Sequence, residues 1–432
     1  MIKTSRRAFL AATAAAHGRI LGANDRIQIG CVGVGGNGFG MLEALVERSG
    51  EAGATVQVVA VSDIYEKRKE RARQAAKLSQ RQIHHDYREV IGNKDVDAVF
   101  LSVPDHWHAR MAIEAMAAGK DVYLQKPMTL TIEEARNITE AAAKYGRILQ
   151  VGSQHLSDQR YHVARDMVAA GEIGKLLWAQ NTYSRNTLAG EWNYFVEPEA
   201  TPETLDWKRW LGSAPDRPFS PERYFRWRKY WDYSGGIATD LFYHRLGPLL
   251  FAMGPQFPSR VSASGGIYVQ KDREVPDTYS TVIEYPDFYV NLSGSMANAG
   301  AQSMILPAIY GQKGTIVIED KGVRLIPEPI YLRAGASAGE KAGKFIPVET
   351  RDLNRAHTDN LFECMRTRKK TVLHPEFGWQ LMTAIRLGVD SYRQGRLMLF
   401  DPMQRRVVER PPNRPAYSGD GTNHPSVKRR RG

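Results

Sequence analysis

The sequence predicts an α/β fold that opens with a doubly wound parallel sheet. Between residues 26 and 151, apolar runs of strand length alternate with segments of helical periodicity, and a glycine-rich turn joins the first strand to the first helix. Strands that alternate with helices form a parallel sheet with helices on both faces. At about 150 residues per domain, 432 residues indicate two or three domains. We place the first domain at residues 24–152 and a second α/β domain at residues 153–400.

The composition excludes several classes of protein. With 42% apolar and 25% charged residues the chain can bury a core, and no run approaches the roughly 18 apolar residues of a membrane-spanning helix. Cys31 and Cys364 fit neither a disulfide framework nor a zinc motif. Half of the formal charge of +12 lies after residue 404, in a segment rich in arginine. We therefore expect a flexible basic arm over residues 401–432 and no nucleic-acid partner.

The N-terminus resembles an export signal. The pair Arg6-Arg7 precedes a short apolar run at residues 8–16, as in the bacterial twin-arginine signal. We expect residues 1–23 to form this signal and the mature protein to be periplasmic or otherwise exported. A basic end on a cytoplasmic protein is the alternative.

The first predicted strand runs into a turn that is typical of dinucleotide-binding domains. The turn matches G-x-G-x-x-G between a strand and a helix. Gly33 allows the tight turn, Gly35 lets the backbone approach a pyrophosphate, and Gly38 lets helix and strand pack closely. The helix N-terminus adds free amide donors and the positive end of the helix dipole. The predicted cofactor-binding residues of this turn are Gly33, Gly35, Gly36, Asn37 and Gly38.

An acidic residue closes the second predicted strand, at residues 56–61. Asp63 follows Gly38 by 25 residues, near the spacing at which a carboxylate binds the ribose hydroxyls of the cofactor. Because a carboxylate repels a 2′-phosphate, Asp63 favours NAD over NADP. Lys67 and Arg68 nearby leave NADP open as the alternative cofactor.

Two further predicted strands end in polar segments. Residues 97–103 lead into a Pro-Asp-His-Trp-His segment, and residues 121–124 lead into Gln-Lys-Pro. Ligands bind beyond the carboxyl ends of parallel strands, so both segments belong to the predicted cofactor site. The residues they contribute to it are Pro104, His106, His108, Gln125 and Lys126.

These motifs and one later segment occur in the order of a known family. The later segment is Ser234-Gly235-Gly236-Ile237-Ala238-Thr239-Asp240-Leu241-Phe242-Tyr243-His244. On this basis the chain resembles the Gfo/Idh/MocA oxidoreductases over roughly residues 26–402. The resemblance implies a Rossmann-type first domain, and a second domain with an open, mainly antiparallel sheet. It also implies a sugar, sugar acid or cyclitol substrate between that sheet and the nicotinamide.

The same resemblance implies catalytic roles for Lys126, Asp240 and His244. Lys126 matches the lysine of the family's Glu-Lys-Pro motif, although Gln125 replaces the glutamate and removes a charge beside the lysine. Asp240 and His244 match its D-x-x-x-H pair, and their i, i+4 spacing predicts one helix face. There the carboxylate would orient the imidazole as a base for a hydroxyl proton, while Lys126 would polarise the same oxygen or relay its proton. Structural ion pairs, and a hydrogen-bonded structural histidine, are the alternatives.

A metal site is a further alternative. His106 and His108 form an H-x-H pair that could join the D-x-x-x-H pair as ligands. Nothing in the sequence completes a ligand shell, so we expect no metal.

A segment unusually rich in aromatic residues follows the first domain. Residues 178–233 hold fourteen aromatic side chains in 56 positions, interleaved with arginines. Flat rings and polar groups suit a carbohydrate, although we expect most of these rings only to fix a long loop to the body of the protein. We expect Arg185, Asn186 and Tyr243 to lie near the substrate.

The sequence therefore predicts an NAD(P)-dependent oxidoreductase that acts on a secondary hydroxyl of a sugar, glycoside or cyclitol. Because little free NAD exists outside the cytoplasm, we expect the cofactor to stay tightly bound. One alternative is an NAD-dependent glycoside hydrolase or lyase that works by transient oxidation and elimination. A second is a non-catalytic sugar-binding or sensing protein with a structural nucleotide. The resemblance also implies a homo-oligomer.

Overall fold

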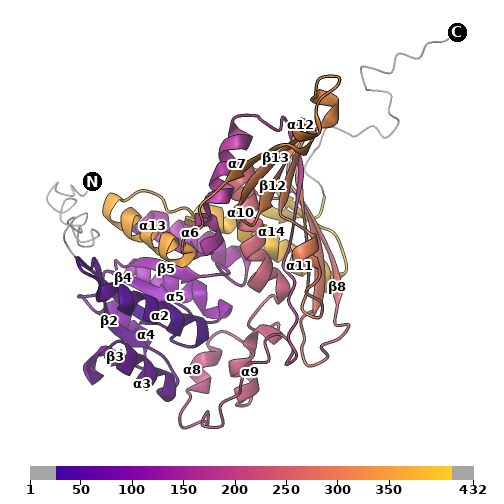
Figure 1. Cartoon of the computed structure of the whole chain (residues 1–432). Helices are drawn as coiled ribbons and strands as arrows, with labels where there is room; N and C mark the ends of the chain where they lie inside the picture. The colour runs from indigo at the N-terminus through magenta and orange to yellow at the C-terminus, as the bar shows by residue number, and fades with distance from the viewer. Residues whose placement is uncertain (1–25, 411–432) are drawn as a thin grey trace, which may run out of the picture.

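The computed structural model of the chain describes residues 26–410, which form two α/β domains side by side (Figure 1). The first domain is built on a six-stranded sheet and the second on a ten-stranded sheet. The expected export signal at residues 1–23 and the arm beyond residue 410 lie outside the described residues. Within residues 26–410, no helix combines the length and the apolar character that crossing a membrane requires.

The six strands of the first sheet run in the order β3-β2-β1-β4-β5-β6, and all neighbours are parallel. This order confirms the predicted doubly wound sheet and puts its switch point between β1 and β4, where a crevice opens for a ligand. The strands are β1 (Ile27–Val32), β2 (Val56–Ser62), β3 (Ile83–His84), β4 (Ala98–Leu101), β5 (Asp121–Gln125) and β6 (Leu149–Gly152). The helices are α2 (Gly36–Ser49), α3 (Glu66–Ala75), α4 (Tyr87–Gly92), α5 (Asp105–Ala117) and α6 (Ile132–Tyr145).

The second sheet is mixed and mostly antiparallel, as expected. Its order is β14-β13-β12-β11-β7-β10-β9-β8-β15-β16, and among these neighbours only β7 and β10 run parallel. The strands are β7 (Leu176–Thr182), β8 (Arg260–Gly266), β9 (Thr278–Glu284), β10 (Tyr289–Ser295), β11 (Ala308–Gly311), β12 (Gly314–Glu319), β13 (Gly322–Pro327), β14 (Lys344–Pro347), β15 (Met398–Asp401) and β16 (Arg406–Val408).

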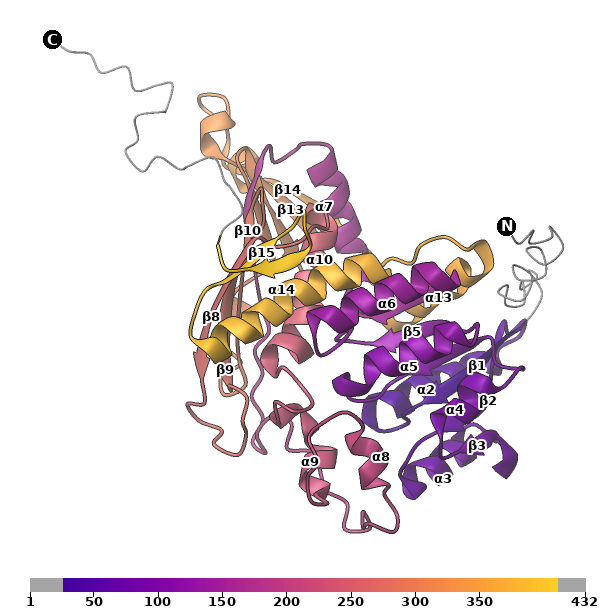
Figure 2. The same ribbon diagram turned by 180° about the vertical axis from the view of Figure 1, so that it is seen from behind.

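Helices cover one face of this second sheet. On the side of the first domain lie α7 (Gln159–Ala169), α10 (Tyr243–Met253) and α14 (Pro375–Gln394) (Figures 1 and 2). The helices are strongly apolar toward the sheet, and Leu246, Leu249 and Leu381 are completely buried. In the part of the chain that the structure describes, no helical layer covers the opposite face across the central strands (Figure 2).

Two expected domain limits need correction. The arm was expected from residue 401, but β15 and β16 extend the second sheet, and Phe400 pairs with Val407. A three-residue strand such as β16 is too short to show a periodicity in sequence. In addition, α13 (Leu353–Thr367) returns to the first domain, where Leu361 and Phe362 join the core beside β1.

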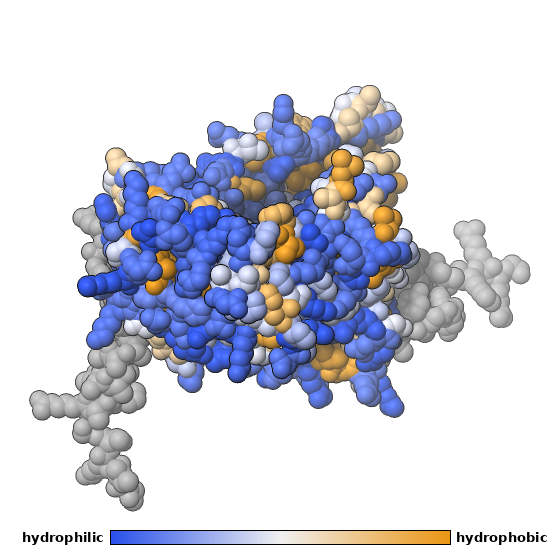
Figure 3. All heavy atoms as spheres, turned by 90° about the horizontal axis from the view of Figure 1, so that it is seen from below, coloured by the Kyte–Doolittle hydropathy of each residue, from blue (hydrophilic) through white to orange (hydrophobic). Residues whose placement is uncertain are grey.

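Residues 184–236, here called the strap, lie between β7 and the first helical turn before α10. The strap carries α8 (Trp207–Leu211) and α9 (Pro221–Phe225), which lie beside the first domain (Figures 1 and 2). Six of its twelve aromatic rings are buried, and three of these, Trp210, Tyr224 and Tyr233, form a cluster with Tyr65 of the first domain. The outer face on this side is mostly hydrophilic, with small scattered apolar patches (Figure 3). The aromatic excess therefore mainly attaches the strap, as we expected for most of these rings.

The glycine turn provides a test of the packing between α2 and the sheet. A Cβ on Gly38 would lie 2.0 Å from the carbonyl oxygen of Gly33, whereas a Cβ on Gly40 of the same helix meets nothing within 4 Å. We expect Gly38→Ala to lower the free energy of unfolding by about 2–3 kcal/mol, because the backbone must move apart. The matched variant Gly40→Ala should raise it by about 0.5–1 kcal/mol, since alanine favours a helix interior over glycine. Urea unfolding of both variants measures the difference, and equal stabilities would contradict this account of Gly38.

Candidate active site

A cavity of about 550 Å³ opens where the carboxyl ends of the first sheet face the strap. The strap forms one wall through residues that include Glu197, Tyr224 and Arg228. The position is the switch point of the parallel sheet, where such folds bind nucleotides. Nine of the predicted site residues line this cavity: Gly33, Gly35, Gly36, Asn37, Gly38, Asp63, Pro104, Gln125 and Lys126.

The glycine turn forms a cradle whose shape fits a dinucleotide. Gly33 has a φ of +78°, and a Cβ there would lie 2.7 Å from the carbonyl oxygen of Ser102. A Cβ on Gly36 would meet nothing within 4 Å, so the chain leaves open space above this residue. The N-terminus of α2 has no side-chain cap and no acidic residue in its first turn. Its amide donors therefore remain available for a phosphate.

Asp63 is held rigidly at the end of β2. It is buried, and its Oδ2 and Oδ1 accept hydrogen bonds from the backbone N–H groups of Val34 (2.9 Å) and Tyr65 (3.0 Å). Each carboxylate oxygen can accept a second hydrogen bond. Asp63 therefore fits the predicted role of a ribose ligand. Its carboxylate is held in place partly by the N–H group of Val34, which belongs to the same glycine turn that forms the phosphate cradle.

Lys126 lies at the end of β5 and binds Asp240 of the second domain. Its Nζ donates to the Oδ1 of Asp240 (2.7 Å) and to the backbone oxygen of the same residue (2.6 Å). Burial lowers the pKa of Lys126 below its usual value, and the Asp240 carboxylate opposes this shift. Gln125 thus replaces the family's glutamate without leaving Lys126 unpaired, because Asp240 supplies the negative charge.

Two residues of the strap also bind Asp240. Its Oδ1 accepts from the Nε of Arg228 (3.0 Å) and its Oδ2 from the Nε1 of Trp192 (3.0 Å). Burial alone would raise the pKa of Asp240, but the charges of Lys126 and Arg228 hold it far below its usual value. Asp240 is therefore a carboxylate throughout the working pH range. Trp192 and Arg228 were not among the predicted site residues, because no spacing distinguishes them from the other aromatic residues and arginines of the strap.

His244 does not pair with Asp240, and this prediction was wrong. Its Nδ1 lies 3.1 Å from the Oγ of Ser153, and its ring packs edge-on against His155 with centroids 5.3 Å apart. Asp240 lies in a π-helical turn, Ala238–Phe242, so the i, i+4 alignment of an α-helix does not apply. Burial lowers the pKa of His244 well below its usual value, and the nearby charge of Lys126 adds to the shift. The imidazole is therefore neutral at pH 7 and able to accept a proton.

His106 and His108 support the site from outside the cavity, which corrects their assignment to cofactor binding. The Nε2 of His106 lies 3.0 Å from the backbone oxygen of Trp210 in the strap. The Nδ1 of His108 lies 2.7 Å from the backbone oxygen of Pro127. Burial lowers the pKa of each to about 4, so both rings are neutral. Both histidines face the protein interior, because the first two turns of α5 are buried.

The three predicted substrate residues lie elsewhere. Arg185 forms an ion pair with Glu191 at 3.0 Å, Asn186 is exposed, and neither lines the cavity. Tyr243 is fully buried, and its hydroxyl donates to the backbone oxygen of Gly378 (3.4 Å). Successive residues of a helix point about 100° apart, so its position beside His244 does not bring it to the same side.

Asp105 is a second buried carboxyl near Lys126. It is 1% exposed, and neither of its oxygens has a hydrogen-bond partner among the side-chain contacts of residues 26–410. Burial raises the pKa of Asp105 well above its usual value, and the charge of Arg228 opposes the shift. No sequence pattern predicted the burial of Asp105, since a single acid at the start of a helix normally faces solvent.

A further arginine, Arg245, follows His244 in α10. Arg245 lies over the ring of Tyr183, with 4.3 Å between its Cζ and the ring centroid. Its Nε is buried and has no hydrogen-bond partner among the described residues. Among residues 26–410, the Nε of Arg245 is therefore a buried donor without an acceptor.

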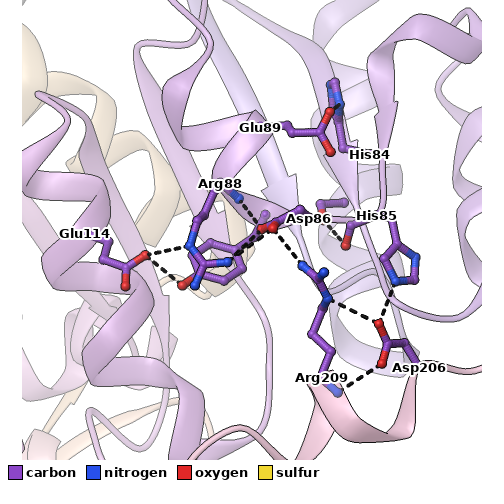
Figure 4. Close-up of polar contacts among 10 residues, drawn as sticks. His84, His85, Asp86, Arg88, Glu89, Glu114, Asp206 and Arg209 are labelled. Carbon is purple, nitrogen blue, oxygen red and sulfur yellow. Dashed lines mark hydrogen bonds and ion pairs between the residues drawn. The ribbon is translucent and has the colours of Figure 1, made fainter.

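A polar network joins α8 of the strap to the first domain (Figure 4). Arg209 of the strap binds the carboxylate of Asp86 (2.7 Å) and that of Asp206 (3.2 Å), which also contacts His85 (2.9 Å). Asp86 in turn binds Arg88 at 3.1 Å. Since both His85 and Arg209 line the cavity, the network attaches α8 directly at its rim.

Comparison with known proteins agrees with this architecture. The sheet order and glycine cradle define a dinucleotide-binding domain of Rossmann type. Residues 27–153 match the family model described as oxidoreductase family, NAD-binding Rossmann fold, and residues 184–287 match that for the C-terminal alpha/beta domain of the same family. Together the matches cover more than half of the chain. The protein belongs to the Gfo/Idh/MocA oxidoreductase family.

Individual relatives resemble only part of the chain at the sequence level. Inositol 2-dehydrogenase from Klebsiella pneumoniae is 33% identical over 191 residues, which is 43% of this chain and 54% of that protein. The corresponding enzyme from Rubrobacter xylanophilus is 30% identical over 195 residues, 44% of this chain and 53% of that protein. The chain thus matches about half the length of these curated relatives.

Solved structures share the fold over most of the chain. A levoglucosan dehydrogenase in complex with NADH and levoglucosan superposes with a TM-score of 0.65 at 18% identity, covering 86% of this chain and 99% of the other. An NAD-binding protein from Listeria innocua superposes with a TM-score of 0.62 at 20% identity, covering 87% and 99%. No group of three or more potential ligands that could hold a metal ion occurs among residues 26–410.

The carboxylate of Asp240 gives a second test. We expect Asp240→Asn to lower the free energy of unfolding by about 3–5 kcal/mol, because Lys126 and Arg228 would remain buried without a negative partner. The control Trp192→Phe keeps an aromatic ring but removes one hydrogen bond to the same carboxylate and part of the buried indole, so it should cost about 1–2 kcal/mol. Urea unfolding at pH 7 measures both. An Asp240→Asn loss no larger than that of the control would contradict the central role of the charge.

Asp105 gives a third test, through pH. Because the folded chain keeps the proton of Asp105 to a higher pH than the unfolded chain, ionisation costs stability as the pH rises above the usual value of 3.8. Asn cannot ionise. The free energy of unfolding of Asp105→Asn, relative to that of the wild type, should therefore increase by up to about 1.4 kcal/mol for each pH unit above 3.8 and should not increase below that pH. The exposed Asp287→Asn should show no such trend. Unfolding measured from pH 3.5 to 7 checks this, and a gain that shrinks with rising pH would contradict it.

Proposed function

We propose that the protein is an NAD(P)-dependent oxidoreductase that acts on a secondary hydroxyl of a sugar, glycoside or cyclitol and keeps its cofactor tightly bound. The observation that carries the proposal is the position of Lys126. This lysine lines the same cavity as the glycine cradle and is fixed by Asp240. Two supports come from relatives, of which some are inositol 2-dehydrogenases and one is a levoglucosan dehydrogenase. Asp63 favours NAD, and the cationic groups on α3 keep NADP as the alternative.

In the proposed chemistry, Lys126 and His244 have separate roles. The bound cofactor supplies a hydride acceptor. Lys126, kept charged by Asp240, donates a hydrogen bond to the substrate oxygen and stabilises the negative charge that develops there. His244 is neutral, lies near enough to Lys126 for the charge of the lysine to lower its pKa further, and takes the hydroxyl proton.

Enclosure of the cavity by the strap supports tight binding of the cofactor. Eight of the residues that line it come from the strap, and the network around Arg209 holds α8 at its rim. A cofactor that cannot exchange freely must be regenerated in place. Either a second substrate is reduced, or the oxidised sugar eliminates its leaving group and is reduced again, as in a redox-neutral glycoside hydrolase or lyase. A non-catalytic sugar-binding protein with a structural nucleotide is the remaining alternative, and the fixed Lys126 disfavours it.

We also propose export by the twin-arginine route, on the basis of Arg6-Arg7 and the apolar run that follows. A location outside the cytoplasm and a captive cofactor are mutually consistent, because the nucleotide would be bound before export.

Self-association through the second domain is a further proposal. On the sheet face without a helical layer, Trp178 stacks on Tyr310 with centroids 4.0 Å apart and on Tyr289 at 5.9 Å. Tyr289 is 37% exposed, and Leu306, just before β11, is 43% exposed. An apolar stripe of this kind on an open sheet favours a homo-oligomer.

One experiment tests the function and separates its alternatives. We expect about one nicotinamide dinucleotide per chain in the supernatant of the denatured protein, and Lys126→Met to retain it while turnover of inositol, levoglucosan or a glycoside falls by about 100-fold or more. Accumulation of a keto product indicates net oxidation, and a released aglycone without net redox indicates the hydrolase or lyase. The exposed control Lys144→Met should keep full activity. Loss of cofactor in Lys126→Met, or turnover equal to that of the wild type, would contradict the role given to Lys126.

A further inference from the structure

Arg228 of the strap uses one of its three side-chain nitrogens to bind the chain. Its Nε donates to the Oδ1 of Asp240 at 3.0 Å, and no other hydrogen bond from its side chain occurs among residues 26–410. Its Cζ lies 4.2 Å from the ring centroid of Trp227, which supports the flat face of the guanidinium. Both residues line the cavity, and 22% of the arginine side chain remains exposed. The terminal groups Nη1 and Nη2 are therefore available to a ligand in the cavity.

These two groups lie beside the lysine that we propose to bind the reacting oxygen. The Nζ of Lys126 donates to the same Oδ1 of Asp240 at 2.7 Å, so it lies within two hydrogen-bond lengths of the Nε of Arg228. Both side chains line the same cavity. A substrate group bound by the guanidinium would therefore be only a few bonds away from the hydroxyl bound by Lys126.

Positive charge exceeds negative charge around the shared oxygen. Lys126 and Arg228 are both cations, and they pair with one carboxylate, that of Asp240. The second buried carboxyl nearby is Asp105, and burial raises its pKa so that it keeps its proton to a higher pH. His244 is neutral because burial lowers its pKa. These five groups together leave one positive charge unbalanced, and an anionic ligand would complement it.

We propose that the substrate carries a carboxylate close to the reacting hydroxyl, and that Nη1 and Nη2 of Arg228 bind this carboxylate. A guanidinium presents its donors in a planar fork that matches the two oxygens of a carboxylate with two parallel hydrogen bonds. The Nε stays on Asp240 at the same time, which fixes the fork relative to Lys126. The substrate is then a sugar acid, such as a uronate or an aldonate. This inference rests on the proposed function, since it needs Lys126 to bind the reacting hydroxyl.

Calorimetric titration of three matched pairs of compounds tests the proposal without any turnover. The pairs are glucuronate and glucose, galacturonate and galactose, and gluconate and sorbitol, in which a carboxylate replaces a CH2OH group. The full-length protein is used with its retained dinucleotide in the reduced form, which cannot accept a hydride. We expect the acid of at least one pair to bind about 10- to 100-fold more tightly than its neutral partner, the usual value of hydrogen bonds to a charged group.

Substitutions of Arg228 test its part in this preference. Arg228→Gln keeps an amide donor for Asp240 but removes the charge and the fork, so the preference for the acid should disappear while binding of the neutral partner changes by less than about 3-fold. Arg228→Lys keeps the charge beside Asp240 and serves if the first variant folds poorly. It should reduce the preference by about 10-fold, because an ammonium lacks the planar fork. The control Arg217→Lys changes a strap arginine that pairs with Asp232 outside the cavity lining, and should bind as the wild type does.

The outcomes separate the proposal from the proposed function. Failure of all three acids to bind, equal affinity within every pair, or a preference that survives both substitutions of Arg228 overturns the proposal. Weaker retention of the dinucleotide by Arg228→Gln with an unchanged preference also overturns it, because Arg228 would then be a ligand of the cofactor. A wild type that neither retains nor binds a nicotinamide dinucleotide overturns the proposed function itself, and is thereby distinguished from a failure of the Arg228 site alone.

Discussion

The arrangement of the site depends on one buried carboxylate. Asp240 accepts hydrogen bonds from Lys126 at the end of β5, and from Arg228 and Trp192 in the strap. These donors come from three separate stretches of the chain and from both domains. Because a buried ion pair is stable only when its charges are balanced and hydrogen-bonded, each donor also constrains the others. Lys126 is therefore held in place only when the two domains are assembled, because neither domain alone supplies all of these contacts.

The groups around Asp240 differ in charge because their surroundings differ. Burial raises the pKa of Asp105, whose side chain has no hydrogen-bond partner within residues 26–410, whereas two cations hold the pKa of Asp240 far below its usual value. Burial lowers the pKa of His244, which keeps a neutral ring beside a charged lysine. Enzymes that transfer protons near pH 7 commonly contain titratable groups whose pKa values are separated in this way. The polar atoms of the site are therefore arranged for proton transfer as well as for binding.

Sequence patterns predicted those features of the site that are determined by the local backbone conformation. The glycine turn, Asp63 and the strand ends that carry Lys126 were found, because spacing along one strand–turn–helix unit determines their positions. The pairing of Asp240 with His244 failed, because a π-helical turn changes which residues share a face. Arg228 and Trp192 contact Asp240 only because the strap folds back over the site. A hydrophobic periodicity predicts helices and strands but not such a long-range contact. Tyr243 and His106 illustrate the same limit, since burial in a core depends on what the rest of the chain brings against them.

The path of the chain between the two domains also affects how the protein unfolds. The strap leaves the second domain, packs on the first and returns, and α13 does the same further along the chain. Arg355 of α13 pairs with Glu51, and Arg368 just beyond it pairs with Asp121, so the second crossing is anchored by charge as well as by Leu361 and Phe362. A cut at residue 152 would remove part of the first domain's own core. Heating should therefore melt the two domains in a single cooperative transition, and the first domain should not be obtainable as a stable fragment.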